Sequence, residues 1–223
     1  METRYVRNLP TLTEEQQAAL GEKHILLAGC GGLGGHLLEL LLRAGVGAVT
    51  AVDGDCFDET NLNRQVLCTT ETLGRRKVLC AQERAALLRP DVRFRAVDAV
   101  LNAENAPDLL HGCDLALDAL DSVEARLVLA DACAAAGIPL VHGAVSGLSM
   151  QAAVIPPGSG LLRRIYAGST SGPAGSVLAP ACAFCAAVQA AEAIRLLVGK
   201  PAELAGKLLW ADLERMEFQT LEL

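Results

Sequence analysis

One short glycine-rich segment constrains the fold of this chain more than any other. Residues 24–29, HILLAG, are apolar on both faces, which is typical of a strand buried in the middle of a parallel sheet. Residues 29–34, GCGGLG, satisfy the pattern G-x-G-x-x-G, and an apolar helical pattern then runs from about Leu33 to Ala44. A strand, a glycine turn and a helix in this order predict a phosphate-binding turn. Glycines let the backbone approach a phosphate, and the start of the helix supplies N–H donors and positive potential.

The rest of the chain alternates between strand-like and helix-like segments, which predicts an α/β fold. The next expected strands span residues 46–53, 92–98, 113–120 and 139–145, and the helices among them span 75–88 and 122–137. Beyond Gly147 the expected order is a sheet extension over 148–168, a small-residue loop over 169–180, a long helix between Pro180 and Gly199, and closing strands over 207–213 and 216–223. With neither an internal repeat nor a linker, residues 1–223 are expected to form a single domain.

Charge and composition narrow the classes of partner. The formal net charge is −7, which argues against general nucleic-acid binding because such proteins present a basic face. Hydrophobic residues make up 52% of the sequence, yet no run approaches the roughly 18 consecutive apolar residues of a membrane span. The N-terminus has no apolar signal core. We therefore expect a cytoplasmic protein whose eight cysteines are reduced and mostly act as small core residues.

An acidic residue at the end of the second expected strand points to a nucleotide ligand. Asp53 lies 24 residues after Gly29, where a carboxylate can accept hydrogen bonds from ribose hydroxyls. The alternative is a glycine-rich packing turn with a capping aspartate. That alternative explains the order of strand, turn, helix and acid less well. The pattern alone fits NAD as well as ATP.

The residues that follow favour ATP. The segment NLNRQ, residues 61–65, comes just beyond Asp53, and Lys77 lies 13 residues after Arg64. An NAD site has little use for an arginine and a lysine here. A triphosphate that reacts at its α-phosphorus needs cations on the developing charge. The alternative for either cation alone is a solvated charge at a helix edge.

Several short motifs are shared with a known family. They are RYVRN (4–8), GCGGLGG (29–35), AGVG (44–47), VDGD (52–55), NLNRQ (61–65), LGRRK (73–77), DALDS (118–122), PLVHGAV (139–145) and VQAAEAI (188–194). With these motifs spread over nearly its whole length, the chain resembles the MoeB/ThiF/HesA family of adenylyltransferases, the bacterial relatives of ubiquitin-activating enzymes. The resemblance implies a Rossmann-like, mostly parallel sheet of about eight strands flanked by helices. It also implies antiparallel C-terminal strands and a homodimer.

The resemblance assigns roles to individual residues. The ATP-binding residues would be Gly29, Gly31, Gly32, Gly34, Asp53, Asp55, Asn61, Arg64, Gln65 and Lys77. In the family pattern the glycines lie near the phosphates and Asp53 contacts the ribose. Asn61, Arg64 and Lys77 surround the triphosphate. Arg64 and Lys77 would be catalytic.

Asp121 is the expected Mg²⁺ ligand, by resemblance and by position. A carboxylate at the carboxyl end of a parallel strand lies at the rim where open sheets bind ligands, and beside phosphates it needs a cation. The alternatives are that Asp121 caps the next helix, or that Asp118 holds the metal. The resemblance also implies that Arg7 reaches into the ATP site of a partner subunit. Its alternative is an ordinary exposed N-terminal arginine.

The implied reaction transfers AMP from ATP to the C-terminal glycine carboxylate of a small ubiquitin-like (β-grasp) sulfur-carrier protein with a Gly-Gly tail. It releases pyrophosphate and would serve a molybdopterin- or thiamine-type pathway. One rival is an NAD-dependent oxidoreductase, for which no hydride-transfer region is evident. A second rival is a non-catalytic docking homologue, for which the retention of Arg64, Lys77 and Asp121 is unexpected.

The chain departs from the family pattern at its cysteines. Many relatives have two CxxC pairs for zinc. Here the first would fall at residues 161–165, which hold no cysteine, so no zinc is predicted. No cysteine occurs in the loop before the long helix, so the reaction is expected to stop at the acyl-adenylate. Cys182 and Cys185 lie in the first turns of that helix, where the helix dipole lowers a thiol pKa. They are expected either to pack as small core residues or to form a redox or persulfide pair. His142 is expected to be a hydrogen-bonded structural residue rather than a proton-transfer group.

Overall fold

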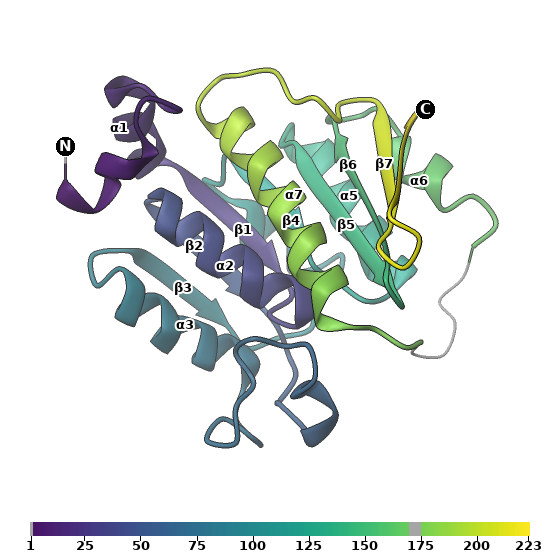
Figure 1. Ribbon diagram of the computed structural model, residues 1–223, viewed down its shortest axis with the longest axis horizontal. Coiled ribbons are helices and arrows are strands. Elements are labelled where there is room, and N and C mark those ends of the chain that lie inside the picture. Colours follow the sequence, from purple (N-terminus) through teal and green to yellow (C-terminus); the bar gives the residue numbers. More distant parts are fainter. Residues whose placement is uncertain (1, 170–174) are drawn as a thin grey trace.

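The computed structural model describes residues 2–169 and 175–223, and the strands within these ranges form one sheet. They are β1 (His24–Ala28), β2 (Ala48–Val52), β3 (Arg93–Val97), β4 (Leu115–Asp118), β5 (Leu140–Ser146), β6 (Ser149–Ile155), β7 (Lys207–Asp212) and β8 (Glu217–Glu222). Their order in the sheet is β3-β2-β1-β4-β5-β6-β7-β8 (Figure 1). Neighbours from β3 to β5 pair in parallel, and neighbours from β5 to β8 pair antiparallel. The predicted Rossmann-like sheet with antiparallel C-terminal strands is confirmed.

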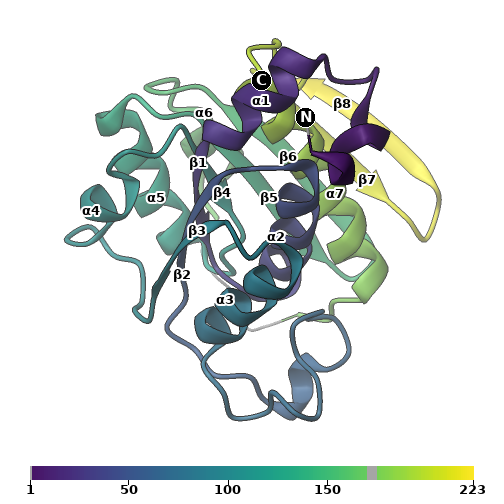
Figure 2. The same ribbon diagram turned by 90° about the vertical axis from the view of Figure 1, so that its left-hand side faces the viewer.

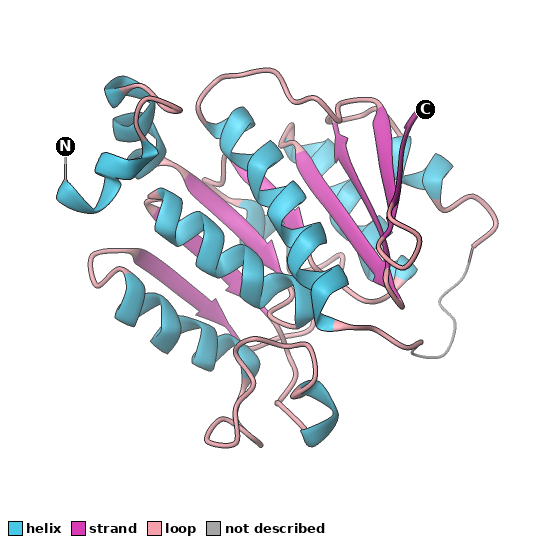
Figure 3. Cartoon of the chain, viewed as in Figure 1, coloured by secondary structure: helices cyan, strands magenta, loops and turns pink. Residues whose placement is uncertain are grey.

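Helices cover both faces of this sheet. The described helices are η1 (Thr3–Asn8), α1 (Glu14–Glu22), α2 (Gly32–Ala44), η2 (Glu59–Asn61), α3 (Lys77–Leu88), α4 (Ala106–Leu110), α5 (Val123–Ala136), α6 (Leu161–Ile165) and α7 (Ala179–Leu197), where η marks a 3₁₀ helix. Helices α2, α3 and α7 lie on one face, and α4, α5 and α6 lie on the other (Figures 1 and 2). Figure 3 shows strands and helices alternating along the first half of the chain, as predicted.

The central strands are apolar because both of their faces are covered. Every residue of β2 is buried, and so is every residue of β1 except His24. On one face, α2 contributes the buried side chains Leu37, Leu38, Leu41 and Leu42 and packs along α7. Each face of the sheet thus has its own hydrophobic core, and both cores meet at β1 and β4.

Helix α7 is long and apolar enough to cross a membrane by length and composition alone. Half of its most apolar 18-residue window is buried, and the helix packs against α2, β5 and β6. The side chains that face the core are mostly small, among them Ala181, Cys182, Cys185 and Ala186. Small side chains allow close helix–sheet approach, and these contacts are those of a core helix.

Several parts of the chain differ from the prediction, among them α4 and η2, which were not predicted, and one part lies outside the described residues. Residues 148–168, expected as a sheet extension, form β6 and then α6, which begins after Gly160 in a left-handed conformation. No element was predicted before β1, yet η1 and α1 form there, and α1 starts at a capping box between Thr13 and Gln16. Of the predicted loop over 169–180, residues 170–174 lie outside the described residues.

The strand order creates a crevice at one edge of the sheet. Strands β1 and β4 are parallel neighbours, but the chain leaves β1 toward β2 on one side and reaches β4 only after β3. At such a switch point the loops diverge from the carboxyl ends of the two strands, and open α/β sheets bind their ligands there. The turn after Ala28 and the turn after Asp118 therefore face each other.

Candidate functional site

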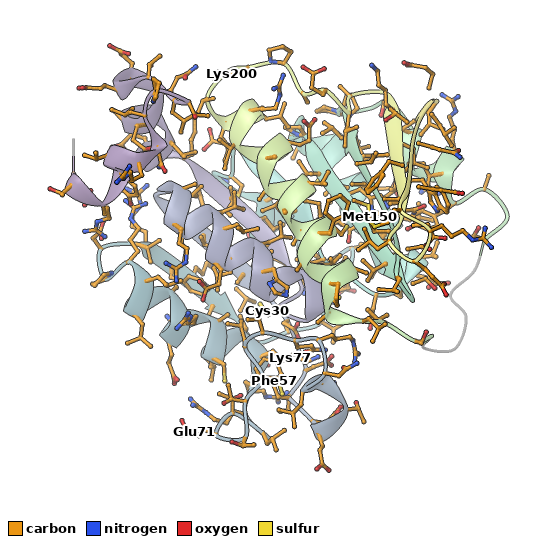
Figure 4. The ribbon with its side chains drawn as sticks, in the orientation of Figure 1. Cys30, Phe57, Glu71, Lys77, Met150 and Lys200 are labelled. Carbon is orange, nitrogen blue, oxygen red and sulfur yellow. The ribbon has the colours of Figure 1, made fainter. Side chains whose placement is uncertain are left out.

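A cleft of about 510 Å³ opens at this switch point. Small-molecule sites span roughly 300–1,000 Å³, so the volume suits a nucleotide-sized ligand. Figure 4 shows Cys30 and Lys77 at the end of the sheet where the cleft lies, and Lys200 at the opposite end. The predicted site residues that line the cleft are Gly29, Gly31, Gly32, Asp53, Asp55, Arg64, Gln65, Lys77 and Asp121.

The glycine turn depends on two close backbone approaches. Gly29 has a φ of +96°, and a Cβ there would lie 2.6 Å from the carbonyl oxygen of Ala119 in the β4 turn. A Cβ on Gly34 would lie 2.0 Å from the carbonyl oxygen of Gly29. Gly34 therefore lets α2 pack onto its own turn and does not line the cleft. Gly31 and Gly32 do line it, at the start of a helix whose first N–H groups have no intrahelical partner.

Asp53 is fixed at the end of β2 by backbone amides. Its Oδ2 accepts a hydrogen bond from the Cys30 amide at 2.7 Å, and its Oδ1 accepts one from the Asp55 amide at 2.9 Å. Burial raises the pKa of the Asp53 carboxyl above its ordinary value, and these two amides and Lys77 oppose that rise. A carboxylate oxygen has a second lone pair, so Asp53 can also accept hydrogen bonds from ligand hydroxyls.

Lys77 brings a positive charge into the cleft. It is the first residue of α3, and its Nζ lies 3.0 Å from Oδ2 of Asp55. The Lys77 side chain is only 10% exposed, whereas that of Asp55 is 67% exposed. An exposed partner holds an ammonium weakly, so an incoming anion can take the place of Asp55 at little cost. This asymmetry makes Lys77 an anion-binding group.

Arg64 and Gln65 form the wall next to the glycine turn. Arg64 Nη1 donates to the carbonyl oxygen of Thr60 and to Oδ1 of Asn63, both at 2.9 Å. Gln65 is buried against Gly31, and its Oε1 has no hydrogen-bond partner within the described residues. An unpaired buried amide is costly. Because Oε1 is itself buried, the Gln65 amide would reach a bound ligand only after its side chain shifts or turns over.

Besides Gly34, two further predicted residues are not brought into this cleft. Asn61 is buried in a capping box with Asp58, to which it donates from Nδ2 and from which it accepts at Oδ1, both at 3.2 Å. It shapes the turn that carries Arg64 instead of facing the ligand space. Arg7 is exposed on η1, which lies beyond the opposite end of β1 (Figure 1). The cleft of the same chain is out of its reach.

The two candidate metal ligands have opposite environments. Asp121 is exposed and lines the cleft. Asp118 is fully buried, and its carboxylate accepts from the Leu120 amide and contacts Nδ1 of His142 at 2.6 Å. Asp118 is therefore committed to the interior, and Asp121 is the carboxylate available to a ligand. Asp121 is not the N-cap of α5. The N-cap is Ser122, whose side chain accepts a hydrogen bond from the Ala125 amide.

Several lining residues escaped the sequence analysis. Val100 and Leu101 line the cleft because they follow β3 at the same carboxyl edge of the sheet. Their position after a predicted strand could have identified them from the sequence. Arg126 lines it from α5, and Tyr166 bonds to Arg126 from beyond α6. In the sequence, Arg126 is one arginine in an apolar helical pattern and Tyr166 is an isolated tyrosine. Both look like surface residues, so their place at the cleft could not be predicted.

The cysteines behave as small core residues. All eight are free thiols, and all except Cys56 are buried. The expectation that the helix dipole lowers the thiol pKa at the start of α7 is wrong, because burial raises the pKa of Cys182 and Cys185. Cys182 lines the cleft, where a Cβ on Gly32 would come within 3.0 Å of its Sγ. His142 is fully buried and hydrogen-bonded, as a structural histidine would be.

Comparison with solved structures supports the fold. The crystal structure of MccB from Escherichia coli with ATP superposes with a TM-score of 0.82, covering 100% of this chain and 71% of that one. The two sequences are 20% identical, so this likeness is one of fold alone.

Comparison of sequences is more specific. A sulfur carrier protein adenylyltransferase from Thermus thermophilus is 37% identical over 96% of this chain and 83% of its own length. The molybdopterin-synthase adenylyltransferase of Escherichia coli is 33% identical over 93% of this chain and 86% of its own length. The probable adenylyltransferase/sulfurtransferase MoeZ of Mycobacterium tuberculosis is 36% identical, and the match spans 59% of MoeZ. The ThiF family profile matches residues 4–223, and the chain belongs to the ThiF family.

Proposed function

We propose that this protein is an ATP-dependent adenylyltransferase that activates the C-terminal glycine carboxylate of a small ubiquitin-like sulfur-carrier protein. Two close relatives in sequence are named as adenylyltransferases of a sulfur carrier protein and of molybdopterin synthase. The observation that carries the proposal is the cleft at the β1–β4 switch point. The glycine turn and Lys77 lie there together with Asp53, the aspartate expected to contact the ribose. Residues 1–223 would act as one adenylation unit.

The reaction requires positioning and charge neutralisation rather than a protein nucleophile. The carrier carboxylate attacks the α-phosphorus of ATP in line, an acyl–phosphate bond forms, and pyrophosphate leaves with the electron pair of the broken P–O bond. Lys77 and Arg64 would bind the phosphates and stabilise the charge that develops on them. Asp53 would accept from the ribose hydroxyls and fix the nucleotide along the cleft.

The site also fits Mg²⁺. Asp121 presents an exposed carboxylate to a cleft that would hold phosphates, and Mg²⁺ in such sites takes one or two carboxylates together with substrate oxygens. The ion, when bound, would neutralise phosphate charge. The chain lacks the paired CxxC motifs of zinc-binding relatives, so we propose that it works without a structural zinc.

The position of Arg7 supports a homodimer. Arg7 is exposed and lies outside the cleft of its own chain, as expected of a residue that acts in a second subunit's site. Neighbouring side chains tie this segment to the rest of the domain. Asn8 donates to the carbonyl oxygen of Ala44 and to Gln17, and Tyr5 is buried against Gly45. We propose that this anchored segment presents Arg7 to the phosphates of the partner subunit.

Pyrophosphate exchange tests the proposed function. Purified protein with Mg²⁺, ATP and labelled pyrophosphate is assayed against a panel of ubiquitin-like carriers, including molybdopterin- and thiamine-type carriers. Each carrier is paired with a variant that lacks the terminal Gly-Gly. We expect exchange with one intact carrier and none with its truncated form. Well-folded protein that exchanges with no carrier contradicts the proposal, and stabilisation by NAD(H) but not by Mg-ATP would support the oxidoreductase alternative.

A further inference from the structure

Behind the wall of the cleft that the turn after β4 forms, buried polar side chains join this turn to the residue that follows α6. We call Asp118, Arg126, His142 and Tyr166 the buried relay. Asp118 and His142 are fully buried and directly paired between β4 and β5. His142 Nδ1 lies 2.6 Å from Asp118 Oδ2, and its Nε2 lies 3.3 Å from Tyr166 Oη. The Tyr166 ring meets the imidazole edge-to-face, with 5.6 Å between ring centroids.

Most donors and acceptors of the buried relay are paired, whereas Arg126 Nε has no hydrogen-bond partner within the described residues. Tyr166 Oη accepts from Arg126 Nη1 at 2.9 Å and from Gln151 Nε2 at 3.0 Å. With two donors on its oxygen, the Tyr166 hydroxyl can direct its own proton to Nε2 of His142, which also lies 3.3 Å from Gln151 Nε2. Nδ1 of His142 then carries the imidazole proton and donates it to Asp118. This assignment satisfies the imidazole without requiring it to be charged.

Arg126 lines the cleft, yet its donors point into the protein. Its Nη2 donates to the carbonyl oxygen of Leu120 at 2.7 Å, and its Nε lies 3.6 Å from Asp118 Oδ2. Asp118 in turn accepts from the Leu120 amide at 3.0 Å through Oδ1. Both the N–H and the C=O of Leu120 are therefore held by the buried relay. The residue after Leu120 is Asp121.

We propose that the buried relay positions the Leu120–Asp121 turn, and that the Tyr166 hydroxyl holds Arg126 in the geometry in which Asp121 can take up a divalent cation with the nucleotide. This inference rests on the proposed function. Arg126 is then a positioning residue rather than a phosphate ligand, although it lines the cleft. Partners that orient a metal ligand typically change metal affinity about 10- to 100-fold when they are removed.

The chain provides a matched control, because it has two tyrosines. Both are buried to a large extent, but Tyr5 Oη has no hydrogen-bond partner within the described residues, whereas Tyr166 Oη has three polar neighbours. Tyr5→Phe and Tyr166→Phe each remove one hydroxyl oxygen. Only the second change breaks the buried relay.

The test is an equilibrium titration of the full-length protein with Mn²⁺ in the presence of a non-hydrolysable ATP analogue, followed by electron paramagnetic resonance. We expect Tyr166→Phe to weaken Mn²⁺ binding about 10-fold and Tyr5→Phe to leave it within about twofold of wild type. In an Asp121→Asn background, Tyr166→Phe should cause no further weakening, because the two changes act through the same ligand. Arg126→Lys keeps a positive charge near Asp118 but cannot donate to both Tyr166 Oη and the Leu120 carbonyl oxygen, so it should reproduce Tyr166→Phe if that variant fails to fold.

Two results would overturn the inference. One is Mn²⁺ affinity in Tyr166→Phe within about twofold of wild type while pyrophosphate exchange by the wild-type protein is intact. The other is an equal loss of affinity in the presence and absence of the Asp121 carboxylate, which would mean that the hydroxyl acts elsewhere. Failure of the wild-type protein to exchange pyrophosphate with any carrier would instead contradict the proposed function itself.

Discussion

The two walls of the cleft differ in what their polar groups bind. Within the part of the chain that the structure describes, the Lys77 side chain on the glycine-turn wall is paired only with a largely exposed carboxylate, and Gln65 Oε1 has no hydrogen-bond partner. On the β4 wall, Asp118 Oδ1 accepts from the Leu120 amide and Arg126 Nη2 donates to the Leu120 carbonyl oxygen, although Arg126 Nε has no hydrogen-bond partner within the described residues. Groups left weakly paired are available to a ligand, whereas groups bonded inside the protein fix its shape. The first wall is therefore suited to binding phosphates, and the second to holding the turn that ends in Asp121.

The largest expected effect comes from removing the charge of the first wall. Lys77→Met should lower the pyrophosphate-exchange rate by about 100-fold or more, because a preorganised charge on the reacting phosphates is lost. Lys207→Met is the matched control, since Lys207 is half-buried on β7, outside the cleft, and pairs with Glu222 at 3.5 Å. Exchange rates of both variants give the comparison. Equal activity of Lys77→Met and wild type would show that the first wall does not carry the phosphates.

A second prediction concerns the backbone contact behind the glycine turn. Gly34→Ala should destabilise the fold by about 3 kcal/mol or more, because its Cβ would collide with the carbonyl oxygen of Gly29. Gly21→Ala is the control. Gly21 lies in α1 with nothing within 4 Å of its Cβ position, so alanine there should be neutral or stabilise by up to about 1 kcal/mol. Urea unfolding measures both. A stable Gly34→Ala protein would mean that α2 can move away from the turn.

The smallest expected effect is on thiol reactivity. Burial raises the pKa of Cys113 and Cys133 to about 12 and also raises the pKa of Cys182 and Cys185. A raised pKa lowers the thiolate fraction at a given pH, and only the thiolate is alkylated rapidly. At pH 8, iodoacetamide should therefore modify the exposed Cys56 at least about 10-fold faster than any of these four, as measured by peptide mass spectrometry. Fast labelling of Cys182 or Cys185 would support the persulfide alternative.

The sequence predicted the first wall better than the second, for a physical reason. Phosphate recognition by a glycine turn relies on contiguous residues in a fixed order, and the same holds for the Arg64–Gln65 segment, so local patterns reveal them. Asn61 was misplaced because an asparagine in a turn can face either a ligand or its own backbone, and here it caps η2. Shared motifs do not distinguish these two cases.

The buried relay was not predictable from the sequence in the same way. Its members come from β4, α5, β5 and the residue after α6, and only the sheet order and the packing of α5 and α6 bring them together. Pairing of Asp118 with His142 follows from parallel register once β4 and β5 are known to be neighbours. Nothing local marks Tyr166. The fold class was predictable because hydrophobic periodicity is local, whereas a network of side chains depends on tertiary contacts.

A crystal structure with Mg²⁺ and a non-hydrolysable ATP analogue is the most direct measurement of how the cleft works. We predict the phosphates between the Gly31–Gly32 backbone and Lys77, with Asp55 displaced from the ammonium. The ribose should lie on Asp53 and the metal on Asp121. A nucleotide bound outside the β1–β4 switch point, or one in the cleft whose phosphates contact neither Lys77 nor Arg64, would contradict the proposed adenylyltransferase site.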